Sequence, residues 1–132
     1  MQIIPRIVFH GNCKEGIELY QDYFDAKVDY INTYGSMKMG TEDQKDLILN
    51  AQLDLKANKF QFADQMNQGV ICGNQITFNI FLESSEEVVS IFTKIAKDGT
   101  TIMEPMETFF SPCHCTVKDK FGIIWQMNSI KK

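Results

Sequence analysis

The alternation of apolar and polar residues predicts two consecutive segments with the same order of elements. In the first, Asn12 and Glu15 have the spacing of a helix capping box, and apolar residues recur behind them at helical spacing. The clearest alternation lies at residues 47–55, with Leu53 on one face and Gln52 on the other. The elements expected are a strand at 3–9, a helix at 13–24, and strands at 28–34, 47–55 and 60–64.

The second segment repeats this order after a polar, glycine-containing connection. Ser84 and Glu87 make a second capping-box pair, and Gly99 is expected to end that helix in the left-handed conformation. The elements expected are a strand at 75–82, a helix at 85–98, and strands at 100–106, 112–118 and 122–128. The apolar side chains expected to be buried against the two helices are Leu49, Leu53, Ile76, Phe78, Ile80, Trp125 and Met127.

Composition narrows the class of protein. The chain of 132 residues fits one domain, and its net charge of −4 without a Lys/Arg cluster argues against binding to nucleic acid or to an anionic membrane. No apolar run is long enough to span a membrane, and the N-terminus has no signal-peptide pattern. The four cysteines, Cys13, Cys72, Cys113 and Cys115, are therefore expected to be reduced thiols in the cytoplasm.

The repeated order strand–helix–strand–strand–strand occurs together with several short motifs. These are Ile4-Pro5, residues 11–15, residues 109–111 and the segment 119–125 that ends in Trp125. In this combination the chain resembles the PhnB-like family of the vicinal-oxygen-chelate (VOC) superfamily, which has the glyoxalase/bleomycin-resistance/dioxygenase fold. The resemblance implies an α+β fold in which two βαβββ modules form a curved mixed-sheet cup.

The same resemblance implies a single domain over residues 1–132, with module 1 at about residues 1–65 and module 2 at about residues 74–130. It also implies a homodimer. The chain departs from the family pattern at Phe110-Ser111, where relatives usually have Trp-Gly, and at Cys113 and Cys115, where they have arginine and glycine. The roles of those family residues are not carried over to this chain.

Metal-using members of the superfamily hold a divalent ion with His, Glu or Gln side chains from four strands. The corresponding positions here are Pro5, Gln61, a residue near Thr77, and Gln126. Proline has no ligating side chain, and neutral amides and a hydroxyl bring neither charge nor imidazole to offset dehydration of the ion. We therefore expect no metal site and no cofactor.

Neutral polar side chains dominate one face of the strands, and such groups both donate and accept hydrogen bonds. If that face lines a cup, it suits an uncharged or zwitterionic small molecule, with aromatic and aliphatic walls. The alternative is a merely solvated sheet face. The ligand-binding residues expected are Phe9, Asn50, Gln52, Gln61, Thr77, Asn79, Phe81, Ile124 and Gln126, and Asn128 shares their polar pattern.

His114 is the one candidate for catalysis, as a general base in the cup; the alternative is a histidine at the surface or at a sheet edge. The function expected is a metal-free, PhnB-like protein that binds a small molecule. The competing readings are a metal-dependent VOC enzyme of the glyoxalase, lyase, isomerase or dioxygenase type, and a dimerisation module without a ligand. The sequence argues against ubiquinone methyltransferase activity, because Gly11 is the lone glycine of the first strand–helix turn.

Overall fold

The computed structural model describes residues 1–132, which divide into two compact units, Met1–Ile71 and Cys72–Lys132. The first unit contains β1 (Arg6–Phe9), α1 (Cys13–Phe24), β2 (Lys27–Thr33), a short 3-10 helix (Glu42–Gln44), β3 (Ile48–Leu55) and β4 (Asn58–Asp64). The second contains β5 (Phe78–Leu82), α2 (Ser85–Asp98), β6 (Thr100–Met106), β7 (His114–Lys118) and β8 (Ile124–Ser129).

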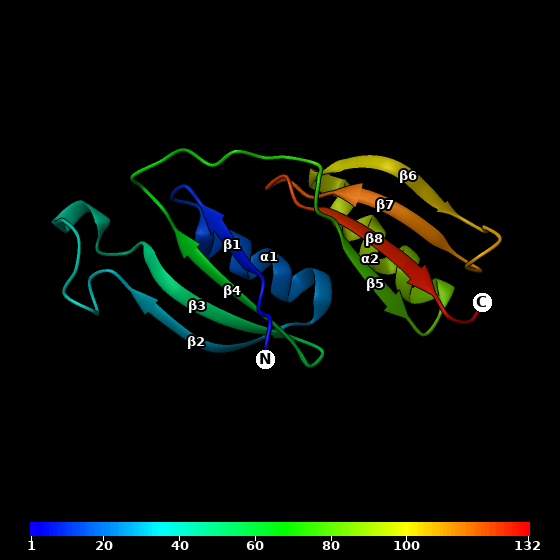
Figure 1. Cartoon of the computed structure of the whole chain (residues 1–132), viewed down its shortest axis with the longest axis horizontal. Coiled ribbons are helices and arrows are strands. Elements are labelled where there is room, and N and C mark those ends of the chain that lie inside the picture. The colour runs from blue at the N-terminus through cyan, green and yellow to red at the C-terminus, as the bar shows by residue number, and fades with distance from the viewer. The chain divides into compact units, whose positions relative to one another are not determined.

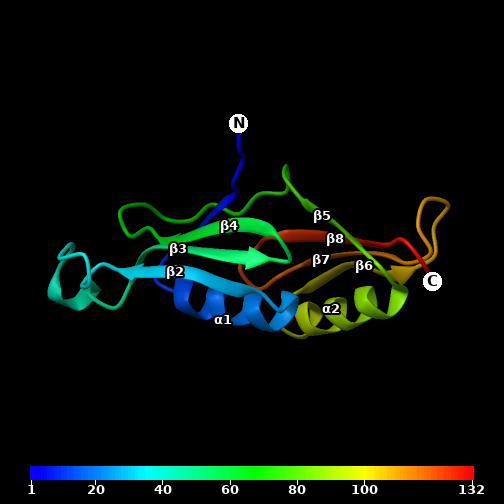
Figure 2. The same ribbon diagram turned by 90° about the horizontal axis from the view of Figure 1, so that it is seen from below.

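The sheet of the first unit has the strand order β1-β4-β3-β2 (Figure 1). β1 runs parallel to β4, and the other neighbours are antiparallel. Helix α1 lies along one face of this sheet (Figure 2). Its Tyr20 is fully buried with its ring 5.5 Å from that of Phe62 on β4, so the core of the unit lies between helix and sheet.

The second unit has the same topology, with the strand order β5-β8-β7-β6 and a parallel pair β5–β8. Val88, Ile91 and Ile95 form the buried stripe of α2. Trp125 and Met127 of β8 are almost completely buried on the side of the sheet that α2 covers. The expected α+β fold with two βαβββ modules is therefore confirmed, each module having one helix and one mixed four-stranded sheet.

Two of the three expected helix signals, Asn12 and Gly99, need correction in detail. Asn12 precedes α1 but its side chain makes no capping hydrogen bond. The carboxylate of Asp64, at the end of β4, instead accepts hydrogen bonds from the backbone N–H groups of Gly11 and Cys13. Gly99 does end α2, but with extended backbone (φ −108°, ψ −156°) rather than left-handed. A side chain there would collide with the carbonyl oxygen of Lys118, so close approach is what requires glycine.

The expected faces of two strands were also partly wrong. The pairing of β2 with β3 shifts between Thr33–Ile48 and Asn32–Asn50, which marks a bulge. The bulge buries Ile48, which simple alternation had placed on the polar face, and leaves Leu49 only partly buried. Ile76 precedes β5 and is 75% exposed, so it is not the core residue expected, and Phe78 and Ile80 are half-buried.

Candidate functional site

Each sheet has a face that its own helix does not cover, called here the first and the second open face. On β8 the side chain of Ser129 contacts Ser85 of α2, so alternate residues Met127 and Trp125 share the helix side. The intervening residues and their direct partners on β5 and β7 must point the other way. The second open face therefore consists of Asn79, Phe81, His114, Thr116, Lys118, Ile124, Gln126 and Asn128.

The first open face contains a connected polar network. The Gln61 side-chain amide donates to Gln52 Oε1 at 3.1 Å, and the Gln52 amide donates to Asp29 Oδ2 at 2.9 Å. Lys59 Nζ lies 2.8 Å from Asp29 and 2.8 Å from Asp54. Both expected glutamines are thus present on this face, but they lie beside an ion-paired cluster that the expectation of a neutral face had missed.

The hydrogen bonds of this cluster favour its charged forms. The Gln52 amide, and then the Lys59 ammonium, lower the pKa of Asp29 below its ordinary value. Lys59, followed by the backbone N–H of Ala57, lowers the pKa of Asp54. The two carboxylates in turn raise the pKa of Lys59. One ammonium between two carboxylates leaves the cluster without a free cation to attract an anionic ligand.

Two of the residues expected on the first open face have different surroundings. Asn50 is exposed and accepts a hydrogen bond from Asn32 of β2, at 2.8 Å. Phe9 lies on the helix side, where its ring packs against Phe62 and directly over Gly16 of α1. The expectation that Phe9 shares a face with the amides is wrong, because β1 directs Phe9 into the core.

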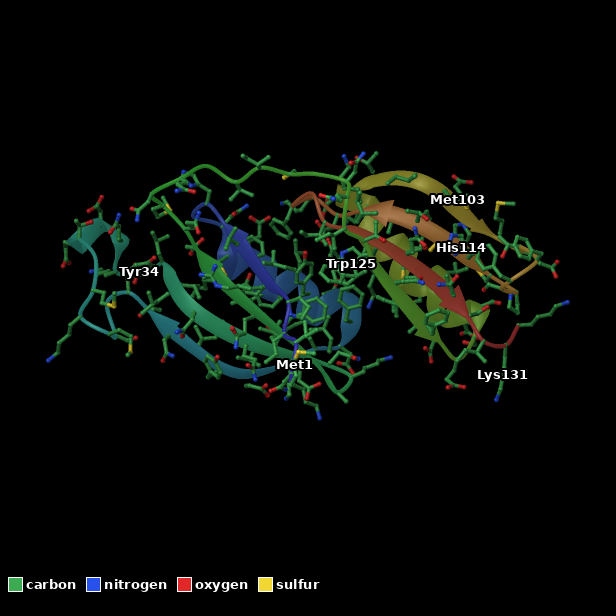
Figure 3. The ribbon with its side chains drawn as sticks, viewed as in Figure 1. Met1, Tyr34, Met103, His114, Trp125 and Lys131 are labelled. Carbon is green, nitrogen blue, oxygen red and sulfur yellow. The ribbon has the colours of Figure 1, made fainter.

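A chain of hydrogen bonds crosses the second open face from β7 to β5. His114 Nδ1 lies 2.7 Å from Asn128 Oδ1, and Asn128 Nδ2 donates to Asn79 Oδ1 at 2.6 Å and to the carbonyl oxygen of Ile80 at 3.3 Å. His114 is 6% exposed and Asn128 is 4% exposed. β7 lies between β8 and β6, so His114 is neither the surface nor the edge histidine that was the alternative reading. Figure 3 labels His114 on this sheet.

Apolar side chains flank this hydrogen-bond chain. The ring of Phe110 packs edge-on against His114, with the centroids 5.1 Å apart. Phe81 is the direct partner of Asn128 on β5 and is 66% exposed. Ile124 is buried on the same face and Gln126 is half-buried, whereas Thr77 precedes β5. The structure thus brings together every second-segment candidate except Thr77 on the strands of one sheet face.

Phe110 is a member of this group that the sequence reasoning had missed. It had been noted only as a departure from a family motif. Its contact depends on how the segment after β6 returns to β7, where the hydroxyl of Ser111 donates to the carbonyl oxygens of Cys113 and Ser129 at 2.9 and 3.0 Å. A serine alone gives no sequence signal for such a contact.

The cysteines next to His114 lie on the helix side of β7. Cys115 is fully buried, and this burial, together with the neighbouring Cys113 thiol, raises its pKa to about 12. Burial also raises the pKa of Cys113. Both groups are therefore held as thiols and point away from the second open face, which removes them as partners of His114.

The residues at the superfamily's metal-binding positions do not fit a divalent ion. Within residues 1–132 no group of three or more His, Cys, Asp or Glu side chains could hold a metal ion. Gln61 is hydrogen-bonded to Gln52 on the first open face. Pro5 offers no ligating atom, and a neutral amide is a weak substitute for the imidazoles and carboxylates that such ions prefer. No helix of the chain is both long and apolar enough to span a membrane.

The fold of these two modules is that of the VOC superfamily. A glyoxalase/bleomycin-resistance/dioxygenase family enzyme from Burkholderia phytofirmans has it as well, with a TM-score of 0.67 and 16% identity over 95% of this chain and 94% of that one. Within this superfamily the chain belongs to the PhnB-like family described as 3-demethylubiquinone-9 3-methyltransferase, whose model matches residues 1–128.

Individual relatives are similar to this chain over nearly their whole length. Protein YjdN of Escherichia coli K12 is 26% identical over 143 residues, which cover 100% of this chain and 97% of YjdN. Protein PA1353 from Pseudomonas aeruginosa superposes with a TM-score of 0.90 at 22% identity, covering 100% of this chain and 99% of that one. A PhnB protein from Bacillus cereus gives a TM-score of 0.84 at 23% identity, covering 98% and 99%.

Proposed function

We propose that this chain is a metal-free binding protein for a small uncharged or zwitterionic polar molecule, acting in the cytoplasm as a homodimer. The observation that carries the proposal is the second open face, where Asn128 and His114 are more than nine-tenths buried although no helix of the unit covers them. Oriented amides and an imidazole between aromatic side chains are typical of a site for small molecules.

The charge distribution supports the same ligand class. On the second open face, the groups next to His114 are the neutral amides of Asn79, Gln126 and Asn128, whereas the ammonium of Lys118 lies opposite Ile124, at the other end of β7. On the first open face, Lys59 is compensated by two carboxylates. A strongly charged ligand beside His114 and Asn128 would therefore lose hydration without gaining a counter-charge from these neighbours.

The family's description refers to methyl transfer, and we do not propose that activity for this chain. Methyltransferases with a Rossmann-type fold bind their cofactor at a glycine-rich turn between a strand and a helix of a parallel sheet. Here Gly11 is the only glycine in the turn from β1 to α1, and the turn from β5 to α2, which consists of Glu83 and Ser84, contains none. A metal-dependent enzyme is the second candidate. The presence of Pro5 and neutral amides at the superfamily's metal-binding positions weighs against it.

The proposal is tested by binding measurements and metal analysis on the same purified protein. We expect less than one equivalent of divalent metal, and saturable binding of a member of a panel of free amino acids, monosaccharides and small phenols, before and after treatment with chelator. Gln61→Leu and Gln126→Leu together should abolish this binding, with the free energy of unfolding unchanged or slightly increased.

The matched control is Gln21→Leu, at an exposed position of α1, which should leave binding intact. The single variants then show which open face contributes. A tightly held equivalent of Ni, Zn or Fe that is lost on mutation of Gln126 would contradict the proposal and support the enzyme reading.

A further inference from the structure

The tautomer of His114 follows from hydrogen bonds that involve no choice of proton position. The carbonyl oxygen of Ile80 only accepts, so the Asn128 atom 3.3 Å from it must be the amide nitrogen. The other terminal atom of Asn128 is then the oxygen, and it lies 2.7 Å from His114 Nδ1. An oxygen acceptor requires a proton on Nδ1. Neutral His114 therefore carries its proton on Nδ1, and its lone pair lies on Nε2.

The Nε2 atom has no partner of its own in this face. The only hydrogen bond that the structure gives the His114 ring is the one at Nδ1, and Nε2 is not a completely buried atom. His114 is 6% exposed, so its position is fixed by packing while Nε2 remains accessible to a hydrogen-bond donor from outside the unit. Phe110 against the ring and Phe81 beside Asn128 provide apolar contact next to that acceptor.

We infer that His114 Nε2 accepts a hydrogen bond from a hydroxyl or N–H group of the ligand, and that Asn128 is the positioning residue that keeps Nε2 unprotonated. The ligand class is a small molecule with a hydrogen-bond donor attached to an apolar, preferably aromatic, body. This inference rests on the proposed function, because it names the chemistry recognised by the same face. A ligand with only acceptor groups at that point would meet the lone pair of Nε2 and be rejected.

The first arm of the test needs no ligand. Nitrogen-15 NMR of the imidazole rings reads the tautomer of His114 at a pH where the ring is neutral, and His10→Gln removes the signal of the only other histidine. We expect protonated Nδ1 in the wild type and loss of that preference in Asn128→Leu. In Asn79→Ser the preference should remain, because the carbonyl of Ile80 still orients Asn128. Protonation of Nε2 in the folded wild type would overturn the inference whether or not Asn128→Leu folds.

The second arm compares phenol with anisole, which have similar aromatic bodies but differ in the hydroxyl donor. We expect phenol to bind at least about tenfold more tightly, and His114→Phe to remove that difference. Equal binding of the two probes would overturn the inference and leave the proposed function standing. Stoichiometric metal, with no panel member bound, would instead contradict the proposed function, and the tautomer measurement would still read the state of His114.

Discussion

Replacement of Asp64 should destabilise the first unit more than any other single carboxylate change there. Asp64 is 3% exposed, and its carboxylate accepts three backbone N–H groups: Oδ1 accepts from Gly11 and Cys13 at 2.9 and 3.0 Å, and Oδ2 from Ile48 at 2.9 Å. One carboxylate therefore joins the start of α1, the start of β3 and the end of β4. No sequence motif connects these segments.

The expected magnitude follows from those hydrogen bonds. Each buried N–H left without an acceptor costs about 1–3 kcal/mol, and the N–H groups of Cys13 and Ile48 are buried whereas that of Gly11 is part-buried. Asp64→Ala should therefore lower the free energy of unfolding by about 2–6 kcal/mol. Asp64→Asn keeps one oxygen for Gly11 and Cys13 but turns its NH₂ group toward the N–H of Ile48. That variant should lose about 1–3 kcal/mol, between the wild type and Asp64→Ala.

Urea unfolding, monitored by circular dichroism, measures the free energies of unfolding of the wild type, Asp64→Asn and Asp64→Ala. Asp46→Ala, at an exposed loop position, is the matched control and should change stability by less than about 0.5 kcal/mol. Total stabilities of such domains are about 5–15 kcal/mol, so Asp64→Ala could unfold the chain, and Asp64→Asn then carries the comparison. The reasoning is refuted if Asp64→Ala lies within about 1 kcal/mol of the wild type.

Three further predictions follow from the remaining contacts. In the native protein, a thiol reagent at mildly alkaline pH should modify Cys72 quickly and Cys115 only on unfolding. The reason is that Cys72 is exposed, whereas burial raises the pKa of Cys115 to about 12. Rapid reaction of both cysteines in the native protein would contradict this prediction. The pKa of Asp54 is lowered from 3.8, so its contribution to stability is present above that value and is lost as the pH falls through the lower, folded-state value. Between about pH 5 and pH 3, the free energy of unfolding should thus fall more in the wild type than in Lys59→Met. Parallel plots of unfolding free energy against pH for the two proteins would disprove that Lys59 lowers the pKa of Asp54. Gly99→Ala should lower the unfolding free energy by about 1–3 kcal/mol, because the new Cβ would collide with the carbonyl oxygen of Lys118. An unchanged melting temperature would contradict this and show that the backbone shifts to accommodate the methyl group.

The order of elements could be predicted from sequence because it depends on local patterns. The helix stripe at Val88, Ile91 and Ile95 has helical spacing, and Ser84 does cap α2 through the backbone N–H of Glu87 at 3.2 Å. Alternation from Ala51 to Leu55 likewise gave the correct faces of β3. These signals come from a few neighbouring residues and survive packing unchanged.

The remaining features depend on contacts between distant residues. Alternation gives two faces for β1 but does not say which one meets a helix, so Phe9 was assigned to the wrong side. The bulge near Leu49 is defined by the register with β2. The pairing of His114 with Asn128 requires the β7–β8 register, and the orientation of Asn128 requires the carbonyl of Ile80 on a third strand. Period-two patterning carries no information about such partners.

The central claim is that the second open face binds a neutral polar molecule without a metal ion. Its most direct test is a ¹H–¹⁵N spectrum of chelator-treated protein titrated with the panel of amino acids, monosaccharides and phenols. The account predicts saturable shifts of the side-chain amide signals of Asn79, Gln126 and Asn128, with equal affinity before and after chelation. It would be contradicted if those signals stayed unchanged with every panel member and moved only after a divalent metal was added.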